Sequence, residues 1–315
     1  MPAKLRCAVI GVGNMGKHHA RIYSQIAQLV SVADPVEAAG KLIADTYHAH
    51  YYRDFREMLH HETIDAVSVA VPTKFHEEIS VYCLQKYIPT LVEKPMSNSV
   101  QSATRIIETA KKENVLLMVG HVERFNPAVI RLKKLIDEGI FGQIVSLNSV
   151  RVGINPPPTP SSNVAIDLGI HDVDIFNFLL GEIPIESNVI KGKIFEKNIS
   201  DSASFLLRYK HATGTIQTNW MTPIKIRKLY ITGTDGFAEL DYITQTLVLY
   251  KHYMHKMATS NFKELVSLAK IPKKQIYISK KEPLREELVY FLALVRKKKV
   301  LYPEFALEAL KIALA

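Results

Sequence analysis

The chain has 315 residues, of which 47% are hydrophobic and 23% are charged, a composition typical of a globular protein with about two domains. Lysine and arginine (40) outnumber aspartate and glutamate (31), giving a formal net charge of +9. A positive net charge of this size is compatible with binding to nucleic acid, anionic lipid or a phosphorylated small molecule. No nucleic-acid-binding motif is recognisable and the lysines gather late in the chain, so we expect a basic enzyme that binds no nucleic acid.

The cysteine content excludes two further classes. Cys7 and Cys83 are far apart and lack metal-ligand spacing, so we expect neither a disulfide framework nor a metal site, and a reducing cytoplasm fits. The sequence contains no long apolar span, and the apolar residues near its start run directly into glycines without a cleavage site. We therefore expect neither a membrane segment nor a signal peptide.

The first motif is a glycine-rich turn. The apolar run Leu5–Ile10 predicts a buried parallel strand, and a Gly-Val-Gly-Asn-Met-Gly stretch follows before a helix that extends to about Gln25. Gly11 permits the tight turn, Gly13 lets the backbone approach a pyrophosphate, and Gly16 lets the helix pack closely on the strand. The stretch lies between a strand and a helix, which favours a dinucleotide-binding site.

An acidic residue ends the next strand. Leu29–Ala33 predicts this strand, and Asp34 follows at about the spacing of the acid that hydrogen-bonds the adenosine ribose. A carboxylate there repels a 2′-phosphate, so we expect NAD rather than NADP. The alternative is that Asp34 only caps the helix beginning near Pro35.

Strands and helices alternate through the rest of this half, which predicts a doubly wound parallel sheet. The expected elements are helix Val36–Tyr47, a short strand near Tyr51-Tyr52, helix Phe55–Leu59, strands Ala66–Val71, Thr90–Val92 and Val115–Gly120, and a helix from Ser97 or Ser99 to Lys112. Thr73 and His76 follow a strand and either line the cofactor crevice or serve as a helix cap and a surface residue.

A Glu-Lys-Pro turn follows the strand Thr90–Val92. Pro95 ends this strand because it lacks a backbone donor and has a fixed φ. Lys94 thus stands at the carboxyl end of a parallel strand, where open α/β sheets bind their ligands. Arg124-Phe125-Asn126-Pro127 has the same position after the last parallel strand, although loop packing with a surface charge is the alternative.

The second half changes character, and we expect an α+β domain with an open, mostly antiparallel sheet. Its expected elements are helix Val129–Glu138, strands Ile144–Val152, Ile185–Ile194, Ser202–Tyr209, Thr213–Trp220, Lys225–Thr232 and Phe237–Asp241, and a helix that begins near Pro283. The proline-rich stretch 154–163 is interpreted as either a linker or a substrate-facing loop. The lysine-rich stretch 251–281 is either a solvated surface or an attraction for phosphate.

Helix Asn163–Leu180 carries the polar side chains of this half. Asp167, His171 and Asp174 stand at i, i+4 and i+7, so an α-helix places them on one face. A lone histidine in such a setting is more often a hydrogen-bonded structural residue than a catalytic one.

Together these motifs resemble the glucose–fructose oxidoreductase, inositol dehydrogenase and rhizopine catabolism (Gfo/Idh/MocA) family. The resemblance covers nearly the whole chain and rests on Gly11–Gly16, Asp34, Glu93-Lys94-Pro95, Arg124–Pro127 and Asp167–Asp174. It implies a Rossmann domain over residues 1–122 and an α+β domain over 123–315 for substrate binding and oligomer contacts, with C-terminal helices able to pack back on the first. It also implies that His171 meets Lys94 across the substrate.

The chemistry of alcohol oxidation suits these residue types. NAD takes the hydride, His171 takes the proton, Lys94 donates to the developing alkoxide, and Asp167 orients the substrate or the imidazole. The expected cofactor-binding residues are Gly11, Gly13, Asn14, Met15, Gly16, Asp34, Val71, Thr73, His76, Glu93 and Lys94. The expected substrate-binding residues are Arg124, Asn126, Arg151 and Asp174.

Within the family, the stretches Val119–Pro127, Ile166–Asp174 and Glu282–Leu288 resemble the branch that oxidises the 3-hydroxyl of UDP-N-acetylglucosamine. This implies a 3-keto product passed to an aminotransferase for lipid A, and a cytoplasmic homodimer or homotetramer that binds no membrane. Two departures are a chain that ends inside a final helix and a loop richer in proline than expected. The alternatives are a dehydrogenase of a free sugar or cyclitol, and a non-catalytic, dinucleotide-sensing regulator.

Overall fold

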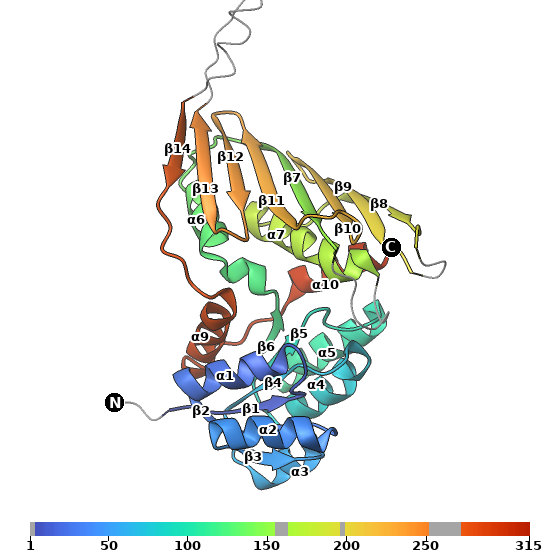
Figure 1. Cartoon of the computed structure of the whole chain (residues 1–315), viewed down its shortest axis with the longest axis vertical. Coiled ribbons are helices and arrows are strands. Elements are labelled where there is room, and N and C mark those ends of the chain that lie inside the picture. Colours follow the sequence, from blue (N-terminus) through green and yellow to red (C-terminus); the bar gives the residue numbers. More distant parts are fainter. Residues whose placement is uncertain (1–3, 155–162, 196–198, 252–271) are drawn as a thin grey trace, which may run out of the picture. The chain divides into compact units, whose positions relative to one another are not determined.

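The computed structural model describes residues 4–154, 163–195, 199–251 and 272–315 (Figure 1). The chain divides into two compact units, the first comprising Met1–Val122 with Glu282–Lys311 and the second Glu123–Lys281 with Ile312–Ala315. Most of the proline-rich stretch (155–162) and of the lysine-rich stretch (252–271) lies outside the described residues.

A six-stranded parallel sheet forms the centre of the first unit. Its strands stand in the order β3-β2-β1-β4-β5-β6, and all neighbouring pairs are parallel. The bounds are β1 (Arg6–Ile10), β2 (Gln28–Ala33), β3 (His50–Tyr52), β4 (Ala66–Val69), β5 (Thr90–Glu93) and β6 (Leu117–Gly120). This is the Rossmann strand order, whose direction of winding reverses between β1 and β4, so the predicted doubly wound sheet is confirmed.

The helices of this unit begin and end where the sequence favours it. They are α1 (Gly16–Ile26), α2 (Glu37–Tyr47), α3 (Phe55–His61), the 3₁₀ turn η1 (Thr73–Phe75), α4 (His76–Gln85), α5 (Val100–Glu113) and α9 (Pro283–Arg296). The side chains of Asp54 and Ser99 cap α3 and α5, while His48 and Asn114 end α2 and α5 in the left-handed conformation. The helix α10 (Glu304–Leu314) follows α9 along the chain.

The C-terminal helix α9 contributes to the core of the first unit. Pro283 stands in its first turn, as predicted, and the helix contacts α1. Leu288 and Phe291 of α9 are fully buried in the same hydrophobic cluster as Ile22 and Tyr23 of α1. The apolar face of α1 therefore packs against a segment more than 250 residues away in the sequence.

An eight-stranded sheet dominates the second unit, in the order β14-β13-β12-β11-β7-β10-β9-β8. All neighbouring pairs are antiparallel except β7 with β10, so the prediction of a mostly antiparallel sheet is confirmed. The bounds are β7 (Ile144–Val152), β8 (Glu186–Gly192), β9 (Ser202–Arg208), β10 (Thr213–Asn219), β11 (Ile226–Gly233), β12 (Gly236–Asp241), β13 (Thr246–Lys251) and β14 (Lys273–Ile276). The strands β13 and β14 were not among those expected from the sequence.

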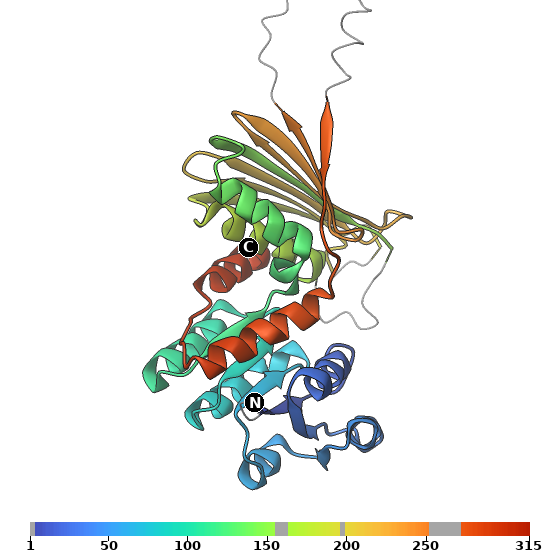
Figure 2. The ribbon, with the colours of Figure 1, turned by 90° about the vertical axis from the view of Figure 1, so that its left-hand side faces the viewer.

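Two helices cover one face of this sheet, α6 (Pro127–Asp137) and α7 (Ile170–Leu180), while no helix of the described residues covers the other face (Figure 2). The strands alternate accordingly: in β9, Phe205 and Leu207 are buried and Leu206 between them is 55% exposed. This two-residue period places one face of the sheet in the core and leaves the other accessible.

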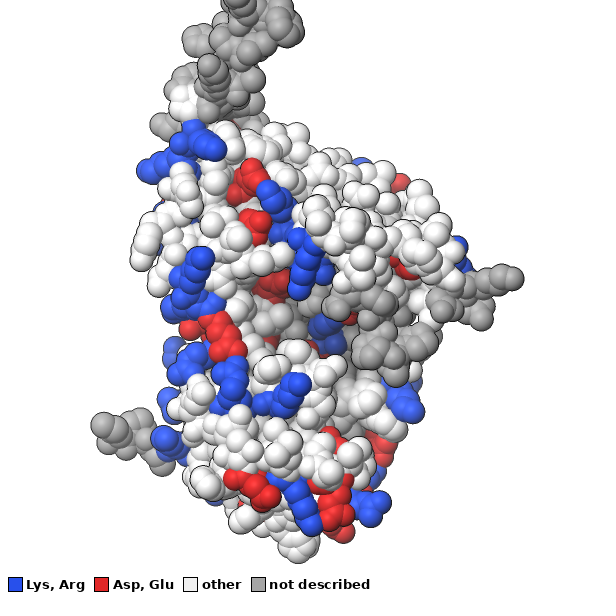
Figure 3. All heavy atoms as spheres, in the orientation of Figure 1, with Lys and Arg blue, Asp and Glu red and all other residues white. Residues whose placement is uncertain are grey.

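The basic excess does not form one continuous tract on the visible face. Figure 3 shows lysine and arginine side chains interspersed with acidic ones over wide uncharged areas. Several basic groups there and elsewhere are paired, for example Arg6 with Asp65 at 2.7 Å and Lys228 with Glu239 at 2.6 Å.

Both cysteines are free and buried in the first unit. Burial raises the pKa of the Cys7 thiol to about 12 and also raises that of Cys83 well above its ordinary value. Neither thiol is therefore reactive at neutral pH, because the thiolate is the nucleophilic form.

Candidate active site

The glycine-rich loop lies between β1 and α1 in the conformation that its glycines permit. Gly11 has a φ of +83°, and a Cβ there would lie 2.7 Å from the carbonyl oxygen of Ala70. A Cβ on Gly16 would lie 1.8 Å from the carbonyl oxygen of Gly11, whereas one on Gly13 would meet nothing within 4 Å. The backbone is thus open at Gly13, beside the start of α1, where the Lys17 N–H donates to the Gly13 carbonyl oxygen at 3.3 Å and the His18 N–H donates to that of Met15 at 2.9 Å. These residues fit the pyrophosphate of a dinucleotide.

Asp34 connects this loop to the end of β2. Its Oδ2 accepts a hydrogen bond from the Val12 N–H at 2.8 Å, and its Oδ1 accepts one from the Val36 N–H at 2.9 Å. Val36, not Asp34, is the N-cap of α2. Each carboxylate oxygen retains a lone pair, so ribose hydroxyls can donate to the same group.

Glu93 is the last residue of β5 and the first residue of the Glu-Lys-Pro turn. Its Oε1 lies 2.8 Å from Nε2 of His19, and its Oε2 accepts a hydrogen bond from the Lys94 N–H at 3.2 Å. Burial alone would raise the pKa of this carboxyl, but its interactions with His19 and, to a smaller extent, with Lys94 more than offset this effect, so the pKa is lowered. A Cβ on Gly120, which pairs with Glu93, would lie 3.1 Å from the carboxylate. The Lys94–Pro95 peptide bond is cis.

His76 joins two strand ends in the same unit and is only 1% exposed. Its Nδ1 lies 2.9 Å from the Pro95 carbonyl oxygen, and its Nε2 lies 2.8 Å from that of Val71. Burial lowers the pKa of this ring, and the contacts with the two carbonyl oxygens oppose that shift in part. The alternative that His76 is a surface residue is therefore wrong, and so is a capping role for Thr73, because Pro72 is the N-cap of η1 and no side chain caps that turn.

The polar helix of the second unit is not one regular α-helix. A π-helical turn, η3 (Ala165–Gly169), precedes α7, so the predicted single α-helical face for Asp167 and His171 is wrong. Asp167 lies in the π turn and accepts a hydrogen bond from Trp220 Nε1 at 3.3 Å. His171 and Asp174 share α7. A Cβ on Gly169 would lie 2.4 Å from the ring of Phe205, so the small residue lets the turn approach β9.

Two residues predicted to bind substrate pair with each other. The Arg124 Nε lies 2.6 Å from Asp174 Oδ2, and its Nη2 lies 2.5 Å from Oδ1. The Asp174 side chain is 1% exposed and that of Arg124 is 26% exposed. This bidentate pair joins the turn η2 (Val122–Phe125) to α7, and the Arg124 guanidinium also lies over the Phe178 ring at 5.5 Å.

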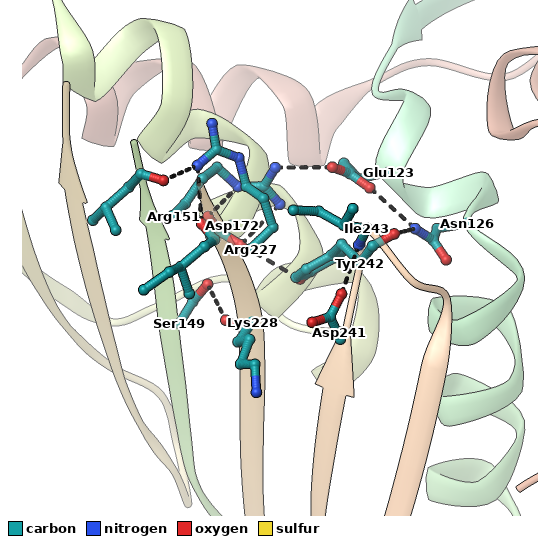
Figure 4. Close-up of polar contacts among 12 residues, drawn as sticks. Glu123, Asn126, Ser149, Arg151, Asp172, Arg227, Lys228, Asp241, Tyr242 and Ile243 are labelled. Carbon is teal, nitrogen blue, oxygen red and sulfur yellow. Dashed lines mark hydrogen bonds and ion pairs between the residues drawn. The ribbon is translucent and has the colours of Figure 1, made fainter. Parts of the chain in front are cut away.

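A buried ionic network lies near the end of β7 (Figure 4). Arg151 Nε lies 2.6 Å from Asp172 Oδ2, and its Nη1 lies 2.8 Å from Glu123 Oε1. The guanidinium also stacks over the Tyr242 ring at 4.7 Å. Burial opposes the charge of Arg151, but Asp172 and Glu123 outweigh it and raise the pKa of the guanidinium.

Asn126 belongs to this network and is 2% exposed. Its Oδ1 accepts from the Ala128 N–H at 3.1 Å, which caps α6, and its Nδ2 donates to the Tyr242 carbonyl oxygen at 3.0 Å. The burial of Asn126 and Arg151 and their contacts with the chain's own groups argue against the predicted direct contacts with substrate.

Three buried polar residues that the sequence patterns did not predict, His19, Ser68 and Tyr23, form hydrogen bonds in series with Glu93. A usable signal was present: Gly16, His19 and Tyr23 recur at helical spacing, so an α-helix packed through Gly16 also buries the other two. Asp172 and Glu123 were missed for a different reason, because their partner Arg151 stands on a distant strand.

Two negative findings apply to the described ranges. Within them, no group of three or more His, Cys, Asp or Glu side chains is arranged to hold a metal ion. No helix among them has the length and apolar character required to span a membrane.

The fold and the glycine loop define an NAD-binding Rossmann domain joined to a second, α+β unit. Residues 5–121 match the model described as "Oxidoreductase family, NAD-binding Rossmann fold", and residues 129–239 match the GFO/IDH/MocA C-terminal domain. The chain therefore belongs to the Gfo/Idh/MocA family of NAD-dependent oxidoreductases, as the sequence motifs predicted.

Several characterised proteins are similar to this chain. UDP-N-acetylglucosamine 3-dehydrogenase of Acidithiobacillus ferrooxidans is 27% identical over 247 residues, which span 78% of this chain and 77% of that protein. Its solved structure superposes with a TM-score of 0.86 at 23% identity, covering 98% of this chain and 95% of that one. The scyllo-inositol 2-dehydrogenase (NAD(+)) of Bacillus subtilis is 31% identical over 189 residues, which span 58% of this chain and just over half (55%) of that protein. A levoglucosan dehydrogenase in complex with NADH and levoglucosan superposes with a TM-score of 0.83 at 19% identity, covering 98% of this chain and 94% of that one.

Proposed function

We propose that this protein oxidises a secondary hydroxyl of a nucleotide-sugar with NAD, specifically the 3-hydroxyl of UDP-N-acetylglucosamine to the 3-keto sugar. The observation that carries the proposal is the Glu93-Lys94-Pro95 turn at the carboxyl end of β5, in an NAD-binding sheet. The similarity to a UDP-N-acetylglucosamine 3-dehydrogenase over 78% of the chain supports this substrate.

In this proposal each residue has one task. NAD, when bound, supplies the hydride acceptor. His171 accepts the hydroxyl proton as general base, since an imidazole titrates near neutral pH. Lys94 donates a hydrogen bond to the oxygen as negative charge develops on it. Asp167, held by Trp220, orients the substrate or the imidazole.

The cofactor is assigned to the carboxyl edge of the parallel sheet. Gly13 leaves room for the pyrophosphate and Asp34 accepts from the ribose hydroxyls. The other residues of this proposed site are Gly11, Asn14, Met15, Gly16, Val71, Thr73, His76, Glu93 and Lys94. Of these, His76 acts through the two carbonyl groups that it contacts, because its ring is buried.

Among the four residues predicted, the direct substrate contact is assigned to Arg124, and Asp174 is assigned to support it. The Arg124 guanidinium, on a side chain that is 26% exposed, suits a phosphate or hydroxyl oxygen, while Asp174 holds the guanidinium in place. Asn126 and Arg151, which are buried, are assigned a structural role near the end of β7 and no direct contact with the substrate.

A second candidate substrate class is a free sugar or cyclitol. It is favoured by the 31% identity to a scyllo-inositol dehydrogenase and by the structural similarity to a levoglucosan dehydrogenase. A dinucleotide-sensing regulator without catalysis is the candidate of another class, and Lys94 together with His171 argues against it.

A substrate screen tests the proposal. Purified protein is incubated with NAD and, separately, UDP-N-acetylglucosamine, N-acetylglucosamine, glucose, myo-inositol or scyllo-inositol, and NADH absorbance is followed. Turnover with the nucleotide-sugar, and a 3-keto product by mass spectrometry, support the assignment. Turnover only with a free sugar or cyclitol moves it to the second class, and no turnover with any of them favours the regulator.

Two variants test the catalytic assignments. Lys94→Ala and His171→Ala should each lower kcat by about 10²–10⁴-fold, the range for a lost proton-transfer group or oxyanion donor. Matched controls are Lys86→Ala in the first unit and His211→Ala in the second, both exposed residues of the same types. Equal kcat in the catalytic and control variants would remove the assigned roles.

The cofactor preference is tested at Asp34. Asp34→Ala should weaken NAD binding and reduce selectivity over NADP by about tenfold or more, because one hydrogen-bonded carboxylate is lost. Kd values for both nucleotides from fluorescence quenching measure it. Unchanged affinities would refute the ribose role.

We also propose a cytoplasmic homodimer or homotetramer whose product passes to an aminotransferase in lipid A synthesis. Light scattering coupled to size exclusion measures the subunit number. Coupled amination of the product by such an aminotransferase tests its placement in that sequence of reactions.

A further inference from the structure

We propose that His19, in helix α1, is a positioning residue that fixes the Glu93 carboxylate behind Lys94 and so sets the position of the lysine for catalysis. This inference rests on the proposed function, in which Lys94 donates to the reacting oxygen. No role for His19 follows from the motifs quoted above or from the similarity to the relatives.

The contacts of His19 form a continuous buried chain in the first unit. Its Nε2 lies 2.8 Å from Glu93 Oε1, and its Nδ1 lies 3.0 Å from Ser68 Oγ. Ser68 Oγ in turn lies 2.7 Å from the Tyr23 hydroxyl. His19, Ser68 and Tyr23 are 0% exposed and Glu93 is 6% exposed, so water does not compete with these hydrogen bonds.

The proton positions follow from donor and acceptor capacity. An ionised carboxylate only accepts, so Nε2 of His19 carries the proton that points to Glu93. With a neutral ring, Nδ1 accepts from the Ser68 hydroxyl, which accepts from the Tyr23 hydroxyl. Every hydrogen in the chain is then used, and all the donors point toward Glu93.

The second oxygen of Glu93 connects this chain to the turn. It accepts a hydrogen bond from the backbone N–H of Lys94, while the α-carbon of Gly120 lies opposite and leaves room for the carboxylate alone. The carboxylate is thus held between a side chain of α1 and the backbone of the residue that it positions. Errors of about 1 Å in a catalytic group cost about 10²-fold in rate.

This series of hydrogen bonds holds Glu93 in position and does not conduct protons to solvent. Tyr23, its last member, is fully buried and packs in the apolar cluster with Ile22 and Phe291. A proton moved along it would therefore reach the hydrophobic core, where a charge is unfavourable.

The experiment compares variants in the full-length protein, with NAD and the substrate found by the screen above. His19→Leu removes both hydrogen bonds at similar volume, His19→Gln keeps an N–H donor, and His18→Leu is the control, because His18 is the exposed neighbour in the same helix. We expect His19→Leu to lower kcat by about 10²-fold with little change in the Kd for NAD. His19→Gln should restore kcat to within about tenfold of the parent.

Two readouts separate positioning from a loss of folding. In a Glu93→Gln background, His19→Leu should have no further effect on kcat, because its target carboxylate is gone. In the parent background, the pKa of the Glu93 carboxyl, measured by NMR of the carbon-labelled protein, should rise, because Glu93 loses the donor that stabilises its charge. Ser68→Ala, which removes only the hydroxyl that donates to Nδ1 of His19, should lower kcat by a smaller factor, and it tests the same hydrogen-bonded series if His19→Leu fails to fold.

The outcomes distinguish this inference from the function on which it rests. Unchanged kcat in His19→Leu or, if that variant does not fold, in Ser68→Ala overturns the inference, as do equal losses in the leucine and glutamine variants or additive effects with Glu93→Gln. If Lys94→Ala is inactive while these results occur, the proposed function stands and only the role of His19 fails. An active Lys94→Ala variant would instead refute the proposed function.

Discussion

The two units bury their polar networks in different ways. Behind Lys94, one carboxylate is held by a backbone N–H and by an imidazole that two hydroxyl groups follow in series. Near β7, the Arg151 guanidinium is matched by two carboxylates and an aromatic face. The first network leaves its negative charge beside Lys94, which the proposed function assigns to the reacting oxygen. The second satisfies its positive charge internally and holds α7 and η2 to the sheet. We therefore expect substitutions in the Glu93 network to change kcat more than the free energy of unfolding. Substitutions in the Arg151 network should change the free energy of unfolding more than kcat.

The largest expected effect is on stability in the second unit. Asp172→Ala leaves the buried Arg151 with Glu123 alone and should lower the free energy of unfolding by about 3–5 kcal/mol, because a buried charge loses a partner. Urea unfolding followed by circular dichroism measures it.

The control is Glu239→Ala, which removes the partly exposed pair with Lys228 and should cost at most about 1 kcal/mol. A double variant, Arg151→Met with Asp172→Leu, should be more stable than Asp172→Ala. Equal stability of the parent and Asp172→Ala would remove the distinction between the two networks.

A medium effect is expected from the glycine opposite Glu93. Gly120→Ala places a Cβ 3.1 Å from the carboxylate and should destabilise the protein by about 1–3 kcal/mol while lowering kcat, because the carboxylate must shift. Gly13→Ala is the stability control, since its Cβ meets nothing within 4 Å and only nucleotide binding should suffer. Thermal unfolding and steady-state rates measure both, and identical unfolding temperatures for the two variants would contradict the crowding argument.

The smallest effect is on the pH dependence of stability. The pKa of Glu93 is lower in the folded protein than its ordinary value of 4.5, so its stabilising contribution is complete above that value and is lost as the pH falls through the folded pKa. Glu93→Gln should therefore flatten the fall in stability below about pH 4.5. Denaturant titrations from pH 3 to 7 measure this, and parallel curves for variant and parent would contradict it.

Most of the fold was predictable because it depends on local patterns. Leu5–Ile10 and Ala66–Val71 are apolar runs between turn residues, and Ile144–Val152 coincides with β7. The strand β14 was not predictable, because Lys273–Ile276 is polar and lies at the edge of the sheet, where it buries little.

The residues of the candidate site also differ in how far the sequence predicts them. The glycine loop and the Glu-Lys-Pro turn have signatures within a few residues of sequence. The burial of Arg151 could not be predicted, since its partners Asp172 and Glu123 come from two other elements and meet only in the folded chain. The π turn before α7 was missed because three residues at i, i+4 and i+7 fit an α-helix equally well.

The two buried cysteines have a practical consequence. Maleimide dyes should leave the folded parent chain unlabelled at neutral pH, so a cysteine introduced at an exposed position becomes the selective attachment point. Lys112 in the first unit and Glu186 in the second, with side chains 82% and 65% exposed, are suitable positions for a donor and an acceptor fluorophore. The resulting energy transfer would report, in real time, how nicotinamide dinucleotide or sugar changes the separation of the two units without any prior removal of native thiols.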